Sequence, residues 1–137
     1  MAEERVLIVE DNETSMKLFR DVLAAAGYRT LEATTGTQAF ELAVEHQPDL
    51  VLMDIQLPDG DGIEALRRLR ADGRTSSVAV LALTAQAMYG DRDRFLTAGF
   101  DGYLSKPVDV LELIGTVRKH CDAAGRRAAH SPETAQR

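Results

Sequence analysis

The stretch LVLMDIQLPDGDG, residues 50–62, decides how the rest of the chain is interpreted. Its first four residues are apolar and predict a buried strand, which the chain leaves at Asp54. The residues that follow are rich in proline, glycine and aspartate, which favour turns. A buried strand therefore ends in a carboxylate beside a loop, and the role of that carboxylate depends on which residues reach the same place from elsewhere in the chain.

The other residues of this loop have a simpler interpretation. We interpret Asp59 and Asp61 as turn residues, and Gly60 and Gly62 as residues that supply permissive backbone dihedrals. Three charged residues of the helix expected next are interpreted as a solvated face; they are Arg67, Arg68 and Arg70.

A short apolar run, a turn and a segment of helical period follow one another five times along the chain. The first, third and fourth runs consist almost entirely of Val, Leu, Ile and Ala, as expected for strands covered on both faces. This alternation predicts an α/β fold with an open parallel sheet and helices on both faces. The expected strands are residues 6–9, 29–33, 50–53, 78–83 and 102–104, and the apolar residues of the five helices begin at Met16, Ala39, Ile63, Phe95 and Val110.

Length and composition limit the class of protein. A chain of 137 residues suits one domain, which we expect over residues 4–121, with 122–137 as a frayed helix end and a flexible tail. The net charge of −6 argues against binding to DNA or to an anionic membrane. The only cysteine, Cys121, favours a reducing compartment, and the first apolar run is too short for a signal peptide. We therefore expect a cytoplasmic protein.

Polar residues follow four of the expected strands, at the sheet edge where ligands of doubly wound folds bind. They are Glu10, Asp11, Asp54, Thr84, Ser105 and Lys106, and Pro107 follows the last of them. Carboxylates close together raise one another's pKa, and a divalent cation removes that cost. Oxygen ligands suit Mg²⁺, and the sequence has no cluster of His and Cys that would suit zinc.

The same edge has the parts needed for phosphoryl transfer. Asp54 can act as a nucleophile toward phosphorus, while Lys106 adds a positive charge and Thr84 a neutral donor. The chain has no glycine-rich nucleotide loop, so we expect the donor to be a phosphoprotein or a small acyl phosphate.

Four motifs at these strand ends, VLIVEDN, LVLMDIQLPDGDG, LALTA and YLSKP, resemble the receiver domains of bacterial two-component response regulators over residues 5–121. The stretches VLIVEDNETSMKLF and TAQAMYGDRDR are similar to stand-alone regulators of the DivK type and to receivers of hybrid kinases. The resemblance implies a flavodoxin-like fold with a five-stranded parallel sheet, order 2-1-3-4-5, and five helices.

The resemblance also implies a role for each matching residue. Asp54 is the expected phosphoacceptor. Glu10, Asp11, Asp54 and the backbone carbonyl of Gln56 are the expected ligands of Mg²⁺, for which Mn²⁺ can substitute. Lys106 is expected to contact the phosphoryl group. The acidic pair is Glu-Asp here rather than Asp-Asp, which the family tolerates.

Further residues are implied to transmit the signal. Thr84 is expected to move toward the phosphoryl group and Tyr103 to rotate inward with it, although Tyr103 also fits a core aromatic. The peptide bond between Lys106 and Pro107 is expected to be cis. The expected partner face lies on the fourth helix, fifth strand and fifth helix and includes Met88, Tyr89, Phe100 and Val108.

The sequence thus predicts a stand-alone response regulator rather than an enzyme. Its expected donor is a phosphohistidine on a histidine kinase or phosphotransfer protein, and its expected output is contact with a downstream protein. A monomer is expected, with dimerisation on phosphorylation left open. The alternatives are a Mg²⁺-dependent phosphatase, which usually has a second carboxylate where this chain has Gln56, a phosphorylation-independent binding module, and a receiver cut from a larger protein.

Overall fold

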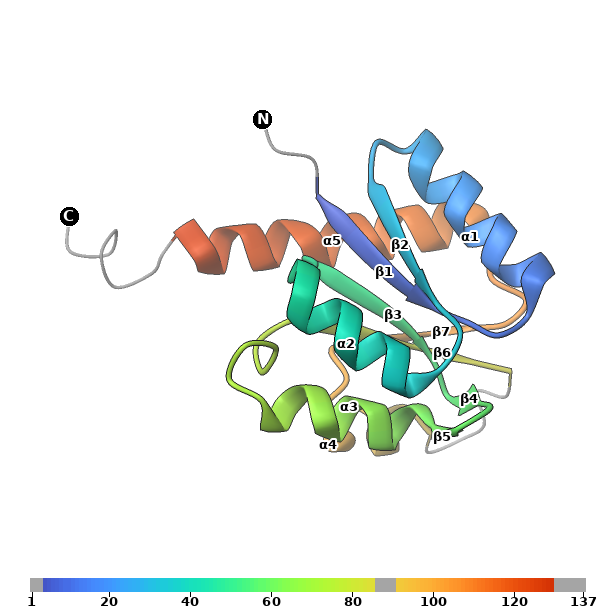
Figure 1. The fold of residues 1–137 in the computed structure, drawn as a ribbon. Coiled ribbons are helices and arrows are strands. Elements are labelled where there is room, and N and C mark those ends of the chain that lie inside the picture. Colours follow the sequence, from blue (N-terminus) through green and yellow to red (C-terminus); the bar gives the residue numbers. More distant parts are fainter. Residues whose placement is uncertain (1–3, 86–90, 130–137) are drawn as a thin grey trace.

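Five parallel strands form the central sheet in the order β2-β1-β3-β6-β7 (Figure 1). The computed structural model describes residues 4–85 and 91–129. The strands of this sheet are β1 (Arg5–Val9), β2 (Arg29–Ala33), β3 (Leu50–Asp54), β6 (Ala79–Thr84) and β7 (Gly102–Ser105). When these five strands alone are numbered along the chain, their order in the sheet is 2-1-3-4-5, so the predicted fold class and strand order are confirmed.

Helices cover both faces of the sheet (Figure 1). They are α1 (Glu13–Ala25), α2 (Gly36–His46), α3 (Gly62–Ala71), α4 (Asp91–Ala98) and α5 (Val110–Ala129). Apolar residues of α1 and α5 form one core cluster with the sheet, and those of α2, α3 and α4 form a second one on the opposite face. None of the helices in the described part of the chain is both long and apolar enough to cross a membrane.

The central strand β3 is buried along its whole length. Leu50 and Leu52 pack in the cluster of α1 and α5, whereas Val51 and Met53 pack in the cluster of α2, α3 and α4. Successive side chains of a strand point to opposite faces, so burial on both faces requires a continuous apolar run. Each of these side chains contributes roughly 2 kcal/mol through burial. The strand is thereby fixed in the fold, with Asp54 at its carboxyl end.

A two-residue antiparallel hairpin, β4 (Gln56–Leu57) and β5 (Gly60–Asp61), follows β3. Gly60 has a φ of +144°, which residues other than glycine rarely adopt, so the prediction that it supplies a permissive backbone dihedral is confirmed. For Gly62 the same interpretation was wrong, because its φ is not positive. A Cβ at Gly62 would instead clash with the backbone oxygen of Asp54 and lie 3.1 Å from the Cα of Ile55. Close approach of two backbones is therefore what requires glycine at this position.

The interpretation of Arg70 as part of a solvated face was also wrong. Its guanidinium donates to the carbonyl oxygens of Ser76 (3.1 Å), Val78 (2.6 Å) and Gly99 (3.1 Å), and to the carboxylate of Asp101 (3.1 Å). These bonds join α3 to the segments that precede β6 and β7. Arg67 and Arg68 are exposed, as interpreted.

The C-terminal boundary expected at residue 121 falls inside α5. Cys121 is buried, and the helix continues beyond it to Ala129. Residues 130–137 lie outside the described part of the chain, so the frayed end and flexible tail stay a prediction. Met88 and Tyr89 of the expected partner face also lie outside it.

Candidate functional site

The carboxyl ends of four strands bring the candidate residues to one edge of the sheet. β1 leads into Glu10 and Asp11. The neighbouring strand β3 ends at Asp54. On the other side of β3, β6 ends at Thr84, which pairs in register with Ser105 of β7, the residue before Lys106. Each residue is thus positioned by a strand that the sequence predicted, because parallel strands end at the same edge.

Lys106 connects two of the carboxylates. Its Nζ lies 2.8 Å from Asp54 Oδ2 and 2.5 Å from Glu10 Oε1. The side chains of Glu10 and Asp54 are 1% and 8% exposed, and that of Lys106 is 22% exposed. The pair is therefore largely shielded from water, where attraction between opposite charges is stronger than at the surface.

Burial also changes the proton affinity of these groups. It raises the pKa of Glu10 above its usual value, and the hydrogen bond from Lys106 only partly opposes this effect. For Lys106, burial acts to lower the pKa, but the bonds to Asp54 and Glu10 outweigh it and raise the pKa above 10.5. Lys106 is consequently a cation at neutral pH, aimed at the Asp54 carboxylate.

The second oxygen of Asp54 is held by the backbone. The N–H of Gln56 donates to Asp54 Oδ1 at 2.8 Å, while the N–H of Ile55 donates to the carbonyl of Leu83 on β6 at 3.0 Å. The Gly62 N–H donates to the Ile55 carbonyl at 2.7 Å and closes the loop. The Asp54 carboxylate is thus oriented from two sides, by Lys106 and by the first residue of β4.

Glu10, Asp11 and Asp54 form a group that could hold a metal ion. One carboxylate oxygen from each lies within 4.8 Å of the others. Glu10 and Asp54 are buried, whereas Asp11 is exposed, so the group opens to solvent on the Asp11 side. Oxygen ligands with access to water suit Mg²⁺, and the donor set therefore fits that ion. The carbonyl of Gln56 stays a predicted ligand.

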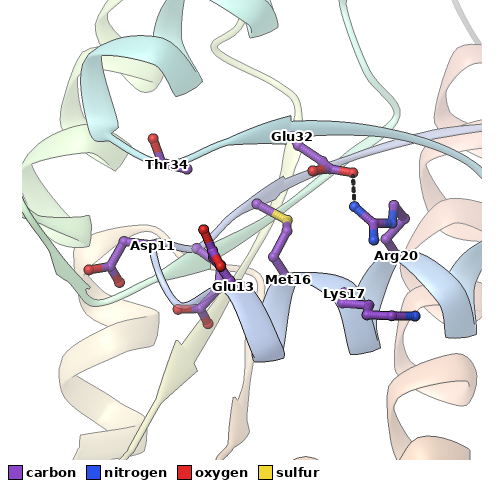
Figure 2. Close-up of a pocket in the computed structure, with 8 residues that line it drawn as sticks. Asp11, Glu13, Met16, Lys17, Arg20, Glu32 and Thr34 are labelled. Atoms are coloured by element: carbon purple, nitrogen blue, oxygen red, sulfur yellow. Dashed lines mark hydrogen bonds and ion pairs between the residues drawn. The ribbon is translucent and has the colours of Figure 1, made fainter.

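A cavity of about 450 Å³ lies beside the acidic pair, between α1 and the end of β2 (Figure 2). Charged side chains line most of it, and Arg20 forms an ion pair with Glu32 at 3.0 Å on one side of it. Figure 2 shows Asp11 and Thr34 on the opposite side of the cavity from this ion pair. The cavity is continuous with the site through Glu10 and Asp11.

The comparison with known proteins agrees with this arrangement. Residues 6–118 match the model of the response regulator receiver domain. The chain belongs to this receiver domain family. It is 47% identical to the polar-differentiation response regulator DivK of Brucella anthropi over 84% of this chain and 94% of that protein, and equally to DivK of Brucella ovis.

Solved receiver structures have the same fold. The receiver domain of a Pseudomonas aeruginosa sensor histidine kinase, solved with a magnesium ion coordinated in its active site cleft, is 36% identical and covers 88% of this chain and 99% of that one, with a TM-score of 0.81. A chemotaxis response regulator of Vibrio cholerae, at 24% identity, covers 87% of this chain and 99% of that one with a TM-score of 0.82 and supports the fold alone. The chain is thus a receiver domain of two-component signal transduction.

The predicted signalling residues of this receiver domain occupy different environments. Thr84 is buried, and its carbonyl accepts from the Lys106 N–H at 2.7 Å. The Tyr103 ring is partly exposed and lies 6.1 Å from that of Phe95. Phe100 is 3% exposed and packs edge-on against Phe95, so it belongs to the core and a partner could reach it only after a rearrangement.

Two other predictions fall on the segment after β7. Val108 is half-buried and packs against the cluster of α1 and α5. The bond between Lys106 and Pro107 is cis, as the resemblance implied.

Sequence reasoning missed what Asp59 and Asp61 do. Asp61 is the N-cap of α3 and accepts from the Glu64 N–H at 2.9 Å. Asp59 accepts three hydrogen bonds from residues at the start of α2. The aspartate followed three residues later by glutamate is a capping signal that could have identified Asp61. Nothing local in the sequence signals the contact of Asp59 with α2.

Proposed function

We propose that this receiver domain is a response regulator that accepts a phosphoryl group on Asp54, from a phosphohistidine of a histidine kinase or phosphotransfer protein, in a Mg²⁺-dependent reaction. The observation that carries the proposal is the position of the Lys106 ammonium, which contacts both Asp54 and Glu10 beside a third carboxylate, Asp11. A single cation shared by buried carboxylates suits a site that receives further negative charge together with a metal ion.

The chain's own residues can perform the transfer without a general base. An oxygen of the ionised Asp54 forms a bond to phosphorus as the bond between phosphorus and the donor imidazole nitrogen breaks, and the electron pair of that bond returns to the imidazole. Lys106 pairs with negative charge on the phosphoryl oxygens. Glu10, Asp11, Asp54 and the Gln56 carbonyl would hold Mg²⁺, which neutralises charge on the same oxygens when bound.

The proposal makes the protein a phosphoacceptor rather than an enzyme that turns over. An aspartyl-phosphate phosphatase usually places an acid or base two residues after its nucleophile, and Gln56, which occupies that position here, cannot transfer a proton. The orientation of Asp54 by the Gln56 N–H supports a positioning part for this residue instead.

The proposed output is protein contact at the face formed by α4, β7 and α5. A groove of about 470 Å³ lies on this face, lined by Leu96 of α4, Tyr103 of β7, and residues of α5 that include Lys119 and His120. Leu96 is 40% exposed, which is high for a leucine and suits a contact surface. Phosphorylation would change this face through Thr84 and Tyr103.

Further parts of the proposal concern location and assembly. We expect the protein to act in the cytoplasm, because its single cysteine is buried and cannot form a disulfide within the chain, which suits a reducing compartment. We expect it to act as a stand-alone regulator, since it matches almost the full length of DivK proteins. We further propose that it is a monomer before phosphorylation. Direct binding of DNA is not part of the proposal.

The proposal is tested with acetyl phosphate and Mg²⁺. Intact-mass spectra should show a single phosphoryl adduct that hydroxylamine removes and that peptide mapping places on Asp54. Asp54→Asn and omission of Mg²⁺ should each abolish the adduct, while Mn²⁺ should restore it. A wild-type protein that forms no adduct while a reference receiver reacts would contradict the proposal. Steady release of phosphate from a small ester would favour the phosphatase, and an Asp54→Asn protein that signals normally would favour the phosphorylation-independent module.

A further inference from the structure

Asp59, at the tip of the β4–β5 hairpin, binds the start of a helix that lies far away in the sequence. Its carboxylate accepts from the N–H of Gly36 at 2.8 Å, from the N–H of Thr37 at 3.0 Å and from the Thr37 hydroxyl at 2.9 Å. Gly36 and Thr37 are the first two residues of α2. The hairpin that follows Asp54 is thus fastened to a different element by one side chain.

The contact completes the capping of α2. The helix has its own N-cap, Thr35, whose hydroxyl accepts from the Gln38 N–H at 3.1 Å. That cap leaves the N–H groups of Gly36 and Thr37, and these are the groups that Asp59 accepts from. A carboxylate at a helix N-terminus is also favoured by the helix dipole. The N–H groups of Gly36 and then Thr37 hold the pKa of Asp59 below its usual value, so the carboxylate is ionised at neutral pH.

Close packing around Gly36 allows the contact. A Cβ at Gly36 would lie 3.2 Å from the Cβ of Ala65 on α3 and 3.5 Å from Asp59 Oδ1. The N-terminus of α2 therefore lies against both α3 and the hairpin tip. A larger residue at position 36 would push these elements apart, so the sequence keeps the three of them in contact.

The other hydrogen bonds of the hairpin lie within it or reach residues close by in the sequence, since the Gln56 N–H donates to Asp54 and Asp61 accepts from the Glu64 N–H of α3. Gln56 pairs with Asp61 and Leu57 with Gly60. At its base, the Gly62 N–H donates to the Ile55 carbonyl at 2.7 Å. Among residues 4–85 and 91–129, the hydrogen bonds that join the hairpin tip to another element of the fold come from Asp59. Leu57 of β4 packs against the cluster of α2, α3 and α4, and Asp59 adds the hydrogen bonds that hold the hairpin tip on α2.

We propose that Asp59 is a positioning residue of the metal and phosphoacceptor site: by fastening the hairpin to α2, it holds Gln56 where its N–H orients the Asp54 carboxylate and where its carbonyl would serve as the predicted ligand of the metal. This inference rests on the function proposed above for Asp54 and its acidic neighbours. Asp59 is not part of the acidic group formed by Glu10, Asp11 and Asp54. It acts through Gln56, as supporting residues of metal sites commonly act through the ligands they hold.

The inference predicts a defect in metal binding when the tether is removed. Asp59→Ala should weaken Mg²⁺ binding about 10-fold, the lower end of what loss of an outer partner costs a metal site. The rate of phosphorylation by acetyl phosphate should fall at limiting Mg²⁺ and approach the wild-type rate at saturating Mg²⁺. Asp59→Asn keeps an acceptor oxygen, so its Mg²⁺ affinity should lie between those of the wild type and Asp59→Ala. Asp72→Ala, which removes a partly buried carboxylate bound to Arg74 two residues later, is the control for loss of charge.

Calorimetric titration of the protein with Mg²⁺ alone measures the affinity without phosphorylation. Two-dimensional amide spectra of the metal-free protein, recorded beside it, follow the Gln56 N–H, whose resonance should shift in Asp59→Ala and not in Asp72→Ala. The inference is overturned if Asp59→Ala loses thermal stability but keeps both its Mg²⁺ affinity, within about twofold, and its Gln56 resonance, since Asp59 would then be only a helix cap. If the wild type binds Mg²⁺ but forms no aspartyl phosphate, the proposed function fails, and the Mg²⁺ affinity of Asp59→Ala still decides whether Asp59 is a positioning residue. If the wild type binds no Mg²⁺, the Gln56 resonance of Asp59→Ala decides this.

Discussion

The ammonium group of Lys106 lies 2.8 Å from the carboxylate of Asp54, although 52 residues separate the two along the chain. The same ammonium contacts Glu10, which is 96 residues away. One cation thus joins the ends of β1 and β3 to the segment after β7. Because Glu10 and Asp54 are almost fully buried, the loss of this cation would leave two carboxylates close together with little water to solvate them.

We therefore expect Lys106→Met to lower the free energy of unfolding in the absence of divalent metal by about 3 kcal/mol, as for the loss of one partner of a buried ion pair. Mg²⁺ should restore part of the loss because it pairs with the same carboxylates. Denaturant unfolding in EDTA and in Mg²⁺ measures both effects. Lys17→Met is the control, because Lys17 also lies 2.5 Å from a carboxylate, that of Asp21, but both side chains are exposed.

Two results would contradict this interpretation. Equal stability of Lys106→Met and wild type in EDTA would mean that Glu10 and Asp54 need no cation. An equal loss in Lys17→Met would mean that burial does not distinguish the two ion pairs.

The hydroxyl of Thr84 is expected to transmit phosphorylation without being required for it. Thr84→Val keeps the shape of this buried side chain and removes its hydroxyl, so it should form the aspartyl phosphate to within about twofold of the wild-type rate while the response of Tyr103 is lost. Ring resonances of Tyr103, recorded before and after reaction with acetyl phosphate and Mg²⁺, measure that response. Thr84→Ser, which keeps the hydroxyl, is the control. A Thr84→Val protein in which Tyr103 still responds would remove Thr84 from the proposed switch.

The strands and the gathering of charged residues could be predicted because each depends on a local pattern. The continuous apolar run that ends at Asp54 specifies a strand covered on both faces, and the alternation of strands with helices specifies a parallel sheet. Once the sheet is parallel, residues after its strands must share an edge. Glu10 and Lys106 could therefore be placed near Asp54 with no knowledge of the distances.

What could not be predicted depends on contacts between elements. The partners of Asp59 lie 23 and 22 residues earlier, on a helix whose approach to the hairpin follows from packing rather than from period or composition. Arg70 has the sequence context of a surface arginine. Only the folded positions of the Val78 and Gly99 carbonyl oxygens make it a hydrogen-bond donor to the backbone. A turn glycine and a close-approach glycine look alike in sequence, which is why Gly62 was misinterpreted.

Acid should release the tether between Asp59 and α2. The folded-state pKa of Asp59 lies below its usual value of 3.8, so the unfolded chain takes up the proton first as the pH falls. The stability that Asp59 contributes is therefore fully present above the unfolded-state pKa and lost as the pH falls through the folded-state pKa. Thermal unfolding of wild type and Asp59→Asn between pH 6 and pH 2 should show a difference that shrinks toward zero with acid. A difference that stays constant over this range would show that ionisation of Asp59 does not stabilise the contact.

Two glycines with opposite surroundings give a test of the close approach beside Asp54. Gly62→Ala should destabilise the protein by about 2 kcal/mol, as overpacking does, because its Cβ would meet the Asp54 backbone oxygen and lie 3.1 Å from both Ile55 Cα and Met53 Cγ. Gly115 lies within α5, and a Cβ there would have no heavy atom within 4 Å. Gly115→Ala should therefore stabilise the protein by about 0.7 kcal/mol through helix propensity alone.

Denaturant unfolding of the two variants in parallel measures this difference in sign. The clash in Gly62→Ala falls on backbone, which cannot rotate away as a side chain can, so the strain must move Asp54 or the start of α3. We accordingly expect Gly62→Ala to weaken Mg²⁺ binding as well, while Gly115→Ala leaves it unchanged. If Gly62→Ala instead matched the wild type in both stability and Mg²⁺ affinity, the end of β3 would have to be free to shift, and the rigid placement of Asp54 argued from its neighbours would be wrong.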